Sequence, residues 1–159
     1  MKNLYVFNPD SSSFVPAEWW LNQKDPFRAE LVGIKTERGM LVLEKRNLGD
    51  YDFEKAQEVA EAFKVDGFDH EFRCPTRREV LDIQDAIDDE LHELFLAIGG
   101  DSLIGDWCWT CERFSEMGWF ARRYNAYNAY IFHGTGGNLG SYYVNGAYRC
   151  QAVTLLRLD

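Results

Sequence analysis

The sequence predicts one α+β domain, in which two helices pack on a small, twisted antiparallel sheet and the last third is rich in loops. Three observations predict it: two short apolar segments on either side of Gly39, two segments with apolar residues at helical spacing, and a change of composition after Gly105. Beyond Gly105 the helical spacing disappears, and Tyr, Asn and Gly replace Leu, Glu and Lys.

The length of the chain fits a single domain. Its 159 residues, 46% of them apolar, can bury most of their unfolded surface without disulfides. No linker divides residues 1–159, so we expect an N-terminal extension and strand in 1–30, followed by the main body in 31–159. The apolar runs are too short for a membrane span or a signal-peptide core, which predicts a cytoplasmic protein, or one displayed on a particle or surface by another route.

The chain is acidic, with a formal net charge of -9 at neutral pH. This balance disfavours nucleic acid and anionic lipid, because both attract clustered Lys and Arg. We therefore expect no nucleic-acid partner. Many of the acidic residues are interpreted as the solvated face of one helix. They are Asp82, Asp85, Asp88, Asp89, Glu90 and Glu93.

The elements of the first half follow from local patterns. Residues 31–34 and 41–43 are apolar and flank a polar stretch with Gly39, which predicts a β-hairpin. Asp52 is predicted to cap the first helix, and Gly67 to interrupt the helical pattern. The apolar positions of this helix are Phe53, Ala56, Val59, Ala60 and Phe63.

The second helix has the clearest start signal in the chain. Thr76 and Glu79 follow Pro75 and form a T-x-x-E capping box, in which each side chain can satisfy a free backbone donor. The pattern predicts one amphipathic helix that ends at Gly99-Gly100 and lies against a sheet. Its apolar stripe comprises Val80, Ile83, Ile87, Leu91 and Leu94.

The last third is predicted to contain three further strands, at residues 129–133, 141–144 and 152–158. Asn145-Gly146 is the dipeptide of a tight hairpin turn. The glycines between His133 and Gly140 do not match a phosphate-binding loop, because they miss the Walker and G-x-G-x-x-G spacings and precede a strand. They are interpreted as a turn.

The four cysteines are Cys74, Cys108, Cys111 and Cys150. In a chain of this size without a secretory signal, we expect them to be reduced. Cys108 and Cys111 form a C-x-x-C, but Trp109 and Thr110 between them indicate a strand, and further ligands at zinc spacing are missing. Buried structural thiols are favoured, with a redox or metal role and a disulfide as alternatives.

The three histidines form no metal or catalytic motif. They are His70, His92 and His133, and none belongs to an H-x-x-x-H or H-E-x-x-H pattern. His92 is assigned to the polar part of the second helix. His133 has two interpretations, as a ligand contact or as a plain strand-end residue.

The segment from Tyr124 to Tyr148 has the composition of a binding surface, since it holds six of the eight tyrosines together with Asn and Gly. Tyr offers large contact area at low entropic cost, and Asn offers adaptable hydrogen bonds. The alternative is that short strands and tight turns also favour these residues. The candidate ligand-binding residues are Trp119, Arg122, Arg123, Tyr124, Asn125, Tyr127, Asn128, Tyr130, His133, Asn138, Tyr142, Tyr143 and Asn145.

Several short motifs resemble one known family in their order along the chain. Residues 72–80 are similar to its R-L-P-T-x-x-E-L segment, and Ile98-Gly99-Gly100 lies where its helix ends at glycine. Trp109-Thr110-Cys111-Glu112 is similar to its W-S-S-T-E strand, and Asn128-Ala129-Tyr130 to its N-A-W/Y strand start. Residues 148–153 lie where Y-V-R-P-V closes the fold. The chain thus resembles C-type-lectin-like domains of the Lcl C-terminal type over about Leu31 to Leu158.

The resemblance implies a C-type-lectin-like fold, related to that of formylglycine-generating enzymes and of the variable proteins of diversity-generating retroelements. The chain departs from the family at Cys74, where Leu is usual, and at Cys150-Gln151-Ala152-Val153, which lacks the Arg and Pro. The calcium-binding tripeptides E-P-N, Q-P-D and W-N-D are missing from the sequence. The resemblance therefore implies the fold and not calcium-dependent sugar binding.

The expected function is non-enzymatic recognition of a protein or glycan through the C-terminal surface, without cofactor or metal. In retroelement-diversified proteins the varied positions lie in this third, so the chain is also a candidate variable protein. One alternative is a structural or receptor-binding subunit of a phage or cell-surface assembly, for which a homo-oligomer is expected. The other is a cysteine-dependent oxidoreductase related to formylglycine-generating enzymes, built on Cys108 and Cys111.

Overall fold

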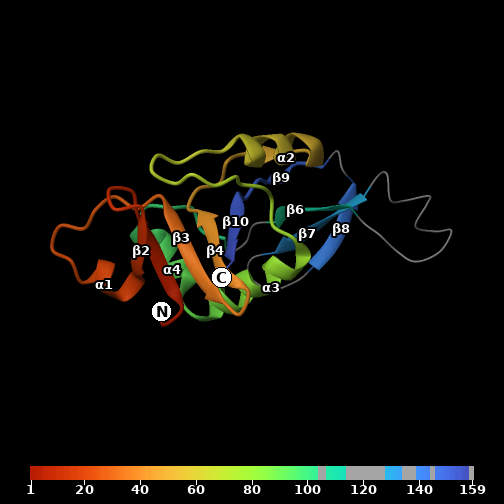
Figure 1. Ribbon diagram of the computed structural model, residues 1–159. Helices are drawn as coiled ribbons and strands as arrows, with labels where there is room; N and C mark the ends of the chain where they lie inside the picture. Colours follow the sequence, from red (N-terminus) through yellow and green to blue (C-terminus); the bar gives the residue numbers. More distant parts are fainter. Residues whose placement is uncertain (104–106, 114–127, 134–138, 144–145, 158–159) are drawn as a thin grey trace.

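A computed structural model describes residues 1–103, 107–113, 128–133, 139–143 and 146–157. These residues form an α+β fold, as the sequence predicts, with two five-stranded sheets (Figure 1). The first sheet is antiparallel and contains, in spatial order, β10 (Val153–Arg157), β4 (Gly39–Glu44), β3 (Leu31–Thr36), β1 (Leu4–Asn8) and β2 (Ser13–Pro16). The second is mixed and contains β5 (Asp50–Tyr51), β9 (Tyr148–Arg149), β6 (Trp107–Arg113), β7 (Asn128–His133) and β8 (Leu139–Tyr143).

The predicted hairpin is confirmed as β3 and β4, which pair antiparallel with Ile34 opposite Leu41. Its turn requires glycine. Gly39 has a φ of +138°, and a Cβ at this position would lie 2.1 Å from the carbonyl oxygen of Leu156 in β10. The missing side chain therefore lets the closing strand β10 approach β4.

The first predicted helix is confirmed as α2 (Phe53–Ala62), and its cap is Asp52, whose Oδ1 accepts a hydrogen bond from the Lys55 backbone N–H at 2.9 Å. The capping box is also confirmed. Thr76 Oγ1 accepts from the Glu79 N–H at 3.2 Å, and Glu79 Oε1 accepts from the Thr76 N–H at 2.9 Å. These bonds start α3 (Arg77–Asp88).

The prediction of one continuous second helix is wrong, because the segment divides into α3 and α4 (Leu91–Ala97). Glu90 lies between them in the left-handed region, with a φ of 72°. This break turns the chain so that Leu91, Leu94 and Phe95 are all buried. The gain in apolar burial offsets the cost of the non-glycine left-handed residue.

A further short helix, α1 (Ala17–Leu21), was not predicted, so the described residues contain four helices rather than two. Trp20 holds α1 in place: its side chain is buried, and its indole N–H donates to the Phe27 carbonyl at 2.9 Å. Within the described residues, none of the helices has the length and apolar character needed to cross a bilayer.

The strands of the last third are confirmed, but their connection differs from the prediction. β7, β8 and β10 occupy the three predicted segments. Asn145 of the predicted Asn145-Gly146 turn lies outside the described residues, but the hairpin pairing of the two strands around it is wrong: β8 pairs with β7, β9 pairs with β5 and β6, and β10 pairs with β4 of the other sheet. After β8 the chain returns to the second sheet as β9, between β5 and β6, and only then crosses to the first sheet as β10, so these pairings are non-local and no turn motif encodes them.

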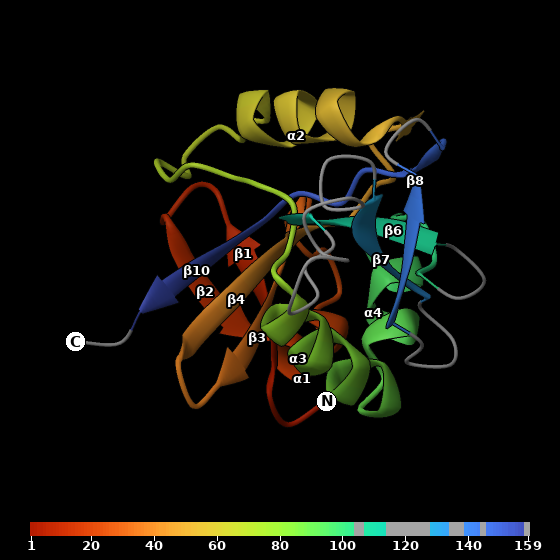
Figure 2. The ribbon, with the colours of Figure 1, turned by 90° about the vertical axis from the view of Figure 1, so that its right-hand side faces the viewer.

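The core lies on both faces of the first sheet. Leu41 and Leu43 belong to a cluster that includes apolar residues of α3 and α4, whereas Val42 belongs to a cluster with Phe53 and Ala56 of α2. Figure 2 shows α2 on one side of the strands, and α3 and α4 on the other. Sheet and helices together form the base that carries the second sheet.

Candidate functional site

The candidate ligand-binding residues divide into two groups. The first lies outside the described residues and comprises Trp119, Arg122, Arg123, Tyr124, Asn125, Tyr127, Asn138 and Asn145. The second lies on β7 and β8, which we call the outer strand pair, and comprises Asn128, Tyr130, His133, Tyr142 and Tyr143.

The backbone register of the outer strand pair brings this second group together. Asn128 lies opposite Tyr143, and Tyr130 lies opposite Ser141. His133 lies at the other end of β7, opposite Trp107 of β6. Candidates separated by up to 15 positions in sequence are therefore neighbours on two adjacent strands.

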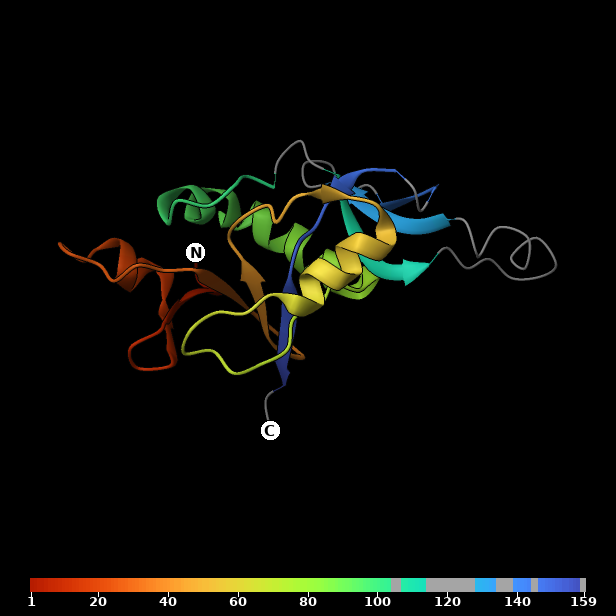
Figure 3. The same ribbon diagram turned by 90° about the horizontal axis from the view of Figure 1, so that it is seen from above.

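The outer strand pair lies at one end of the molecule. β8 is the edge strand of the second sheet, next to β7, and the contacts of α2 with this sheet are mainly to β5 and β6. Figure 1 and Figure 3 show β7 and β8 at the end opposite α1 and β2. The strands that carry the candidate residues are thus at the periphery of the fold.

Trp109 anchors the second sheet to the base. Its side chain is fully buried, and its indole N–H donates to the Tyr51 carbonyl at 2.7 Å. The ring makes edge-to-face contacts with Phe53 of α2, at a centroid distance of 5.6 Å, and with Tyr148, at 5.1 Å. The central strand of the second sheet is therefore fixed by one large aromatic side chain.

Hydrogen bonds attach the rest of β6 to the helical base. Gln57 of α2 donates from its Nε2 to the Thr110 carbonyl at 3.0 Å, and the Cys111 backbone N–H donates to the Pro75 carbonyl at 2.9 Å. Arg77, the first residue of α3, donates to Glu112 twice, from its backbone N–H at 2.9 Å and from Nε at 2.7 Å. The strand beside the outer strand pair is thus attached to α2, to Pro75 and to the start of α3.

Two buried cations fix the loop after α4, and sequence reasoning missed both. Arg149 of β9, only 1% exposed, donates to the carbonyls of Ser102 at 2.6 Å and Asp101 at 3.3 Å. The Lys45 ammonium donates to the carbonyls of Ala29 at 2.8 Å and Ile98 at 3.0 Å. Their hydrogen-bond partners are backbone carbonyls from distant segments, which leave no sequence motif, and Lys45 also lies 3.6 Å from the Glu30 carboxylate. In the sequence, the Gly99-Gly100 pair is a local sign of a tightly held loop.

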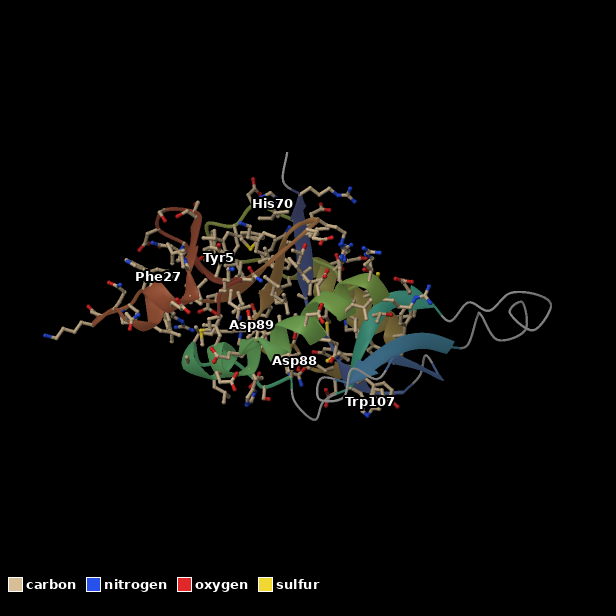
Figure 4. All side chains as sticks on the ribbon, turned by 90° about the horizontal axis from the view of Figure 1, so that it is seen from below. Tyr5, Phe27, His70, Asp88, Asp89 and Trp107 are labelled. Atoms are coloured by element: carbon tan, nitrogen blue, oxygen red, sulfur yellow. The ribbon has the colours of Figure 1, made fainter. Side chains whose placement is uncertain are left out.

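Trp107 is a second aromatic residue that sequence reasoning left out of the candidate set. It lies on β6 two positions before the buried Trp109, yet 37% of its surface is exposed. Figure 4 shows it on the second sheet, far from Tyr5 of the first. Because Trp107 pairs with His133, it extends the candidate surface from the outer strand pair onto β6.

The thiols near the sheet are poorly suited to nucleophilic chemistry. Cys108 is fully buried, and burial raises the pKa of the half-buried Cys111 thiol even though Arg73 opposes the rise. At neutral pH this thiol is protonated, whereas the thiolate is the reactive form. Among the described residues, no three His, Cys, Asp or Glu side chains are grouped in a way that could hold a metal ion.

No model of a known protein family matches the chain, and no curated protein matches it.

Proposed function

We propose that the chain is a recognition module that binds a protein or a glycan through a surface centred on the outer strand pair. The observation that carries this proposal is the position of β7 and β8. These strands hold five of the candidate residues at the periphery of a sheet whose central strand is firmly anchored.

A rigid base favours binding. When the bound surface is already ordered, little conformational entropy is lost as the partner binds. Trp109, Gln57 and Arg77 restrain β6, and β6 in turn pairs with β7. Tyr and Asn on such a platform supply contact area and hydrogen bonds without a catalytic group. This combination supports recognition as the function.

We also propose that the scaffold is C-type-lectin-like. The order of its elements supports this: the β3–β4 hairpin, α2, α3, the second sheet and finally β10. The closing strand β10 returns to pair with β4, so the two ends of this region meet in one sheet. In the retroelement-diversified proteins that the chain resembles, the varied positions lie in the C-terminal third, which supports a displayed C-terminal surface.

The proposal is tested by a triple variant, Tyr127→Ala, Asn128→Ala and Tyr142→Ala. Wild-type and variant chains are compared on a glycan array and in pull-downs from lysate analysed by mass spectrometry. The control is Trp19→Ala, which removes a half-exposed aromatic from α1, at the opposite end of the molecule. We expect a glycan or protein that binds the wild type and the control, and not the triple variant.

Thermal unfolding of the same three chains separates a binding role from a structural one. We expect the triple variant to keep a melting temperature close to that of the wild type. A large loss of stability together with the loss of binding would contradict the proposal, because these residues would then be needed for folding.

A further inference from the structure

Cys74 and Cys150 meet in the core although 76 positions separate them in sequence. Cys74 follows Arg73, whose backbone pairs with Val153 through hydrogen bonds of 2.9 and 2.7 Å. Cys150 follows β9 in the crossing from the second sheet to the first. Both thiols are fully buried, and both donate to the same carbonyl oxygen, that of Ala56, at 3.7 and 3.2 Å.

Two thiols that share one acceptor lie close together, and each shifts the pKa of the other. A hydrogen bond from Cys74 lowers the pKa of the Cys150 thiol, and the same interaction together with burial raises the pKa of the Cys74 thiol. This is the arrangement of a dithiol in which one sulfur is more readily ionised and the other holds the proton.

We propose that Cys74 and Cys150 form a disulfide when the chain meets a small-molecule disulfide such as oxidised glutathione. The cross-link would join the segment that leads into α3 with the crossing between the two sheets. It would therefore tie together the first sheet, α3 and the base of the second sheet. This inference is independent of the ligand proposed above.

The exchange takes place in two steps. The Cys150 thiolate attacks one sulfur of oxidised glutathione, forms a mixed disulfide and releases one glutathione thiolate, which takes up the proton that Cys150 lost. Cys74 then loses its proton and attacks Cys150 Sγ, which releases the second glutathione as a thiol. Two electrons pass from the cysteine pair to glutathione, and the two thiol protons leave with the two glutathione molecules.

Burial decides when the exchange can occur. Helix α2 covers the pair, because Ala56 supplies the shared acceptor and also packs in the same core cluster. A reagent reaches the sulfurs only before folding is complete or when α2 opens. Once folded, the pair is protected in either redox state, so its state records the environment in which the chain folded.

The other two cysteines do not offer the same pairing. Cys108 and Cys111 are three positions apart on β6, so their side chains project from opposite faces of the strand. Cys108 belongs to the core cluster of α3 and α4, whereas Cys74 and Cys150 belong to the cluster of α2. The half-buried Cys111 also packs against the α2 cluster, but it is Cys74 and Cys150 that both donate to the Ala56 carbonyl. A cross-link between Cys74 and Cys150 is therefore the one that the fold favours.

The test is to refold the full chain from urea in a buffer of reduced and oxidised glutathione, block free thiols with N-ethylmaleimide, and digest with trypsin. The sequence makes the result unambiguous, because residues 74–77, 150–157 and 79–113 are separate tryptic peptides. We expect peptide 74–77 linked to peptide 150–157, with Cys108 and Cys111 both blocked. We also expect the melting temperature to rise by roughly 5–10 °C, because the cross-link closes a long loop.

Variants sharpen the test. Cys108→Ser with Cys111→Ser should still form the cross-link, whereas Cys74→Ser should leave a glutathione adduct on peptide 150–157. A natively folded wild type with four blocked cysteines at the most oxidising ratio would overturn the proposal. A different pairing, or a cross-linked chain that melts below the reduced one, would also overturn it. If a variant does not fold, the peptide map of the wild type still decides.

Discussion

The inner strands and the outer strand pair differ in what surrounds them. In β3 and β4, residues 31–34 and 41–44 are all buried, because helices cover both faces of the first sheet. β7 and β8 lie at the edge of the second sheet, and their main contacts are with strands of that sheet. The difference teaches that the tightly packed strands of the first sheet supply the core, whereas the outer strand pair lies at the edge of the fold.

The sharpest test of this comparison uses two tryptophans on the same strand. Trp109→Ala removes a fully buried ring and its hydrogen bond to Tyr51, so we expect it to cost about 4 kcal/mol of unfolding free energy. Trp107→Ala removes a ring that is 37% exposed, and we expect a loss of about 1 kcal/mol. Urea unfolding measures both. Equal losses would break the comparison, since β6 would then be structural along its whole length.

A second test addresses the ion pair at the start of α3. Arg73 donates to Glu79 through two bonds of 2.5 and 2.8 Å, while Glu79 also completes the capping box. Glu79→Gln removes the charge, and we expect a loss of about 2 kcal/mol at neutral pH. As a control, Lys55→Gln removes an exposed pair with Glu58 and should change the stability little.

The pH dependence of this effect follows from the pKa of Glu79. Burial alone would raise that pKa, but the hydrogen bonds and charge of Arg73, with the Thr76 N–H, lower it below the ordinary value. The stabilisation is therefore complete above a pH of about 4.3, the ordinary pKa of Glu, and is lost as the pH falls through the lower folded value. We expect the wild type and Glu79→Gln to converge in stability only in strong acid.

A third test uses a buried carboxyl group whose pKa is raised rather than lowered. Glu44, at the end of β4, is fully buried, and burial raises its pKa although Arg46 donates to it at 2.6 Å. The folded state therefore binds this proton more tightly than the unfolded chain. As the pH falls through the raised value towards about 4.3, the wild type should gain stability relative to Glu44→Gln, by about 1 kcal/mol. Urea unfolding across this range measures the gain, and parallel curves for the two chains would contradict it.

Local signals in the sequence predicted the starts of elements, because the interactions that start a helix or turn a hairpin lie within a few residues. The caps at Asp52 and Thr76 and the turn at Gly39 are of this kind. The break at Glu90 was missed because the apolar stripe continues at helical spacing across it.

Non-local pairing explains the other differences. The assignment of β9 and β10 to different sheets depends on contacts with β5 and β4, about a hundred positions or more earlier. The same holds for Arg149, whose role depends on carbonyls that any residue could supply. Of the candidate site, sequence reasoning identified the strands of the outer pair, but not Trp107, because an exposed and a buried Trp look alike in a strand pattern.

The smallest expected effect belongs to the outer strand pair itself. Tyr142→Ala and Asn128→Ala, made singly, should each change the unfolding free energy by no more than about 0.5 kcal/mol, because β8 is the edge strand of the second sheet and β7 lies next to it. A matched inner variant is Val42→Ala on β4, where loss of a fully buried side chain should cost about 2 kcal/mol or more. Losses at Tyr142 or Asn128 as large as that at Val42 would mean that the outer pair belongs to the core, and the division between a stable base and a displayed surface would then fail.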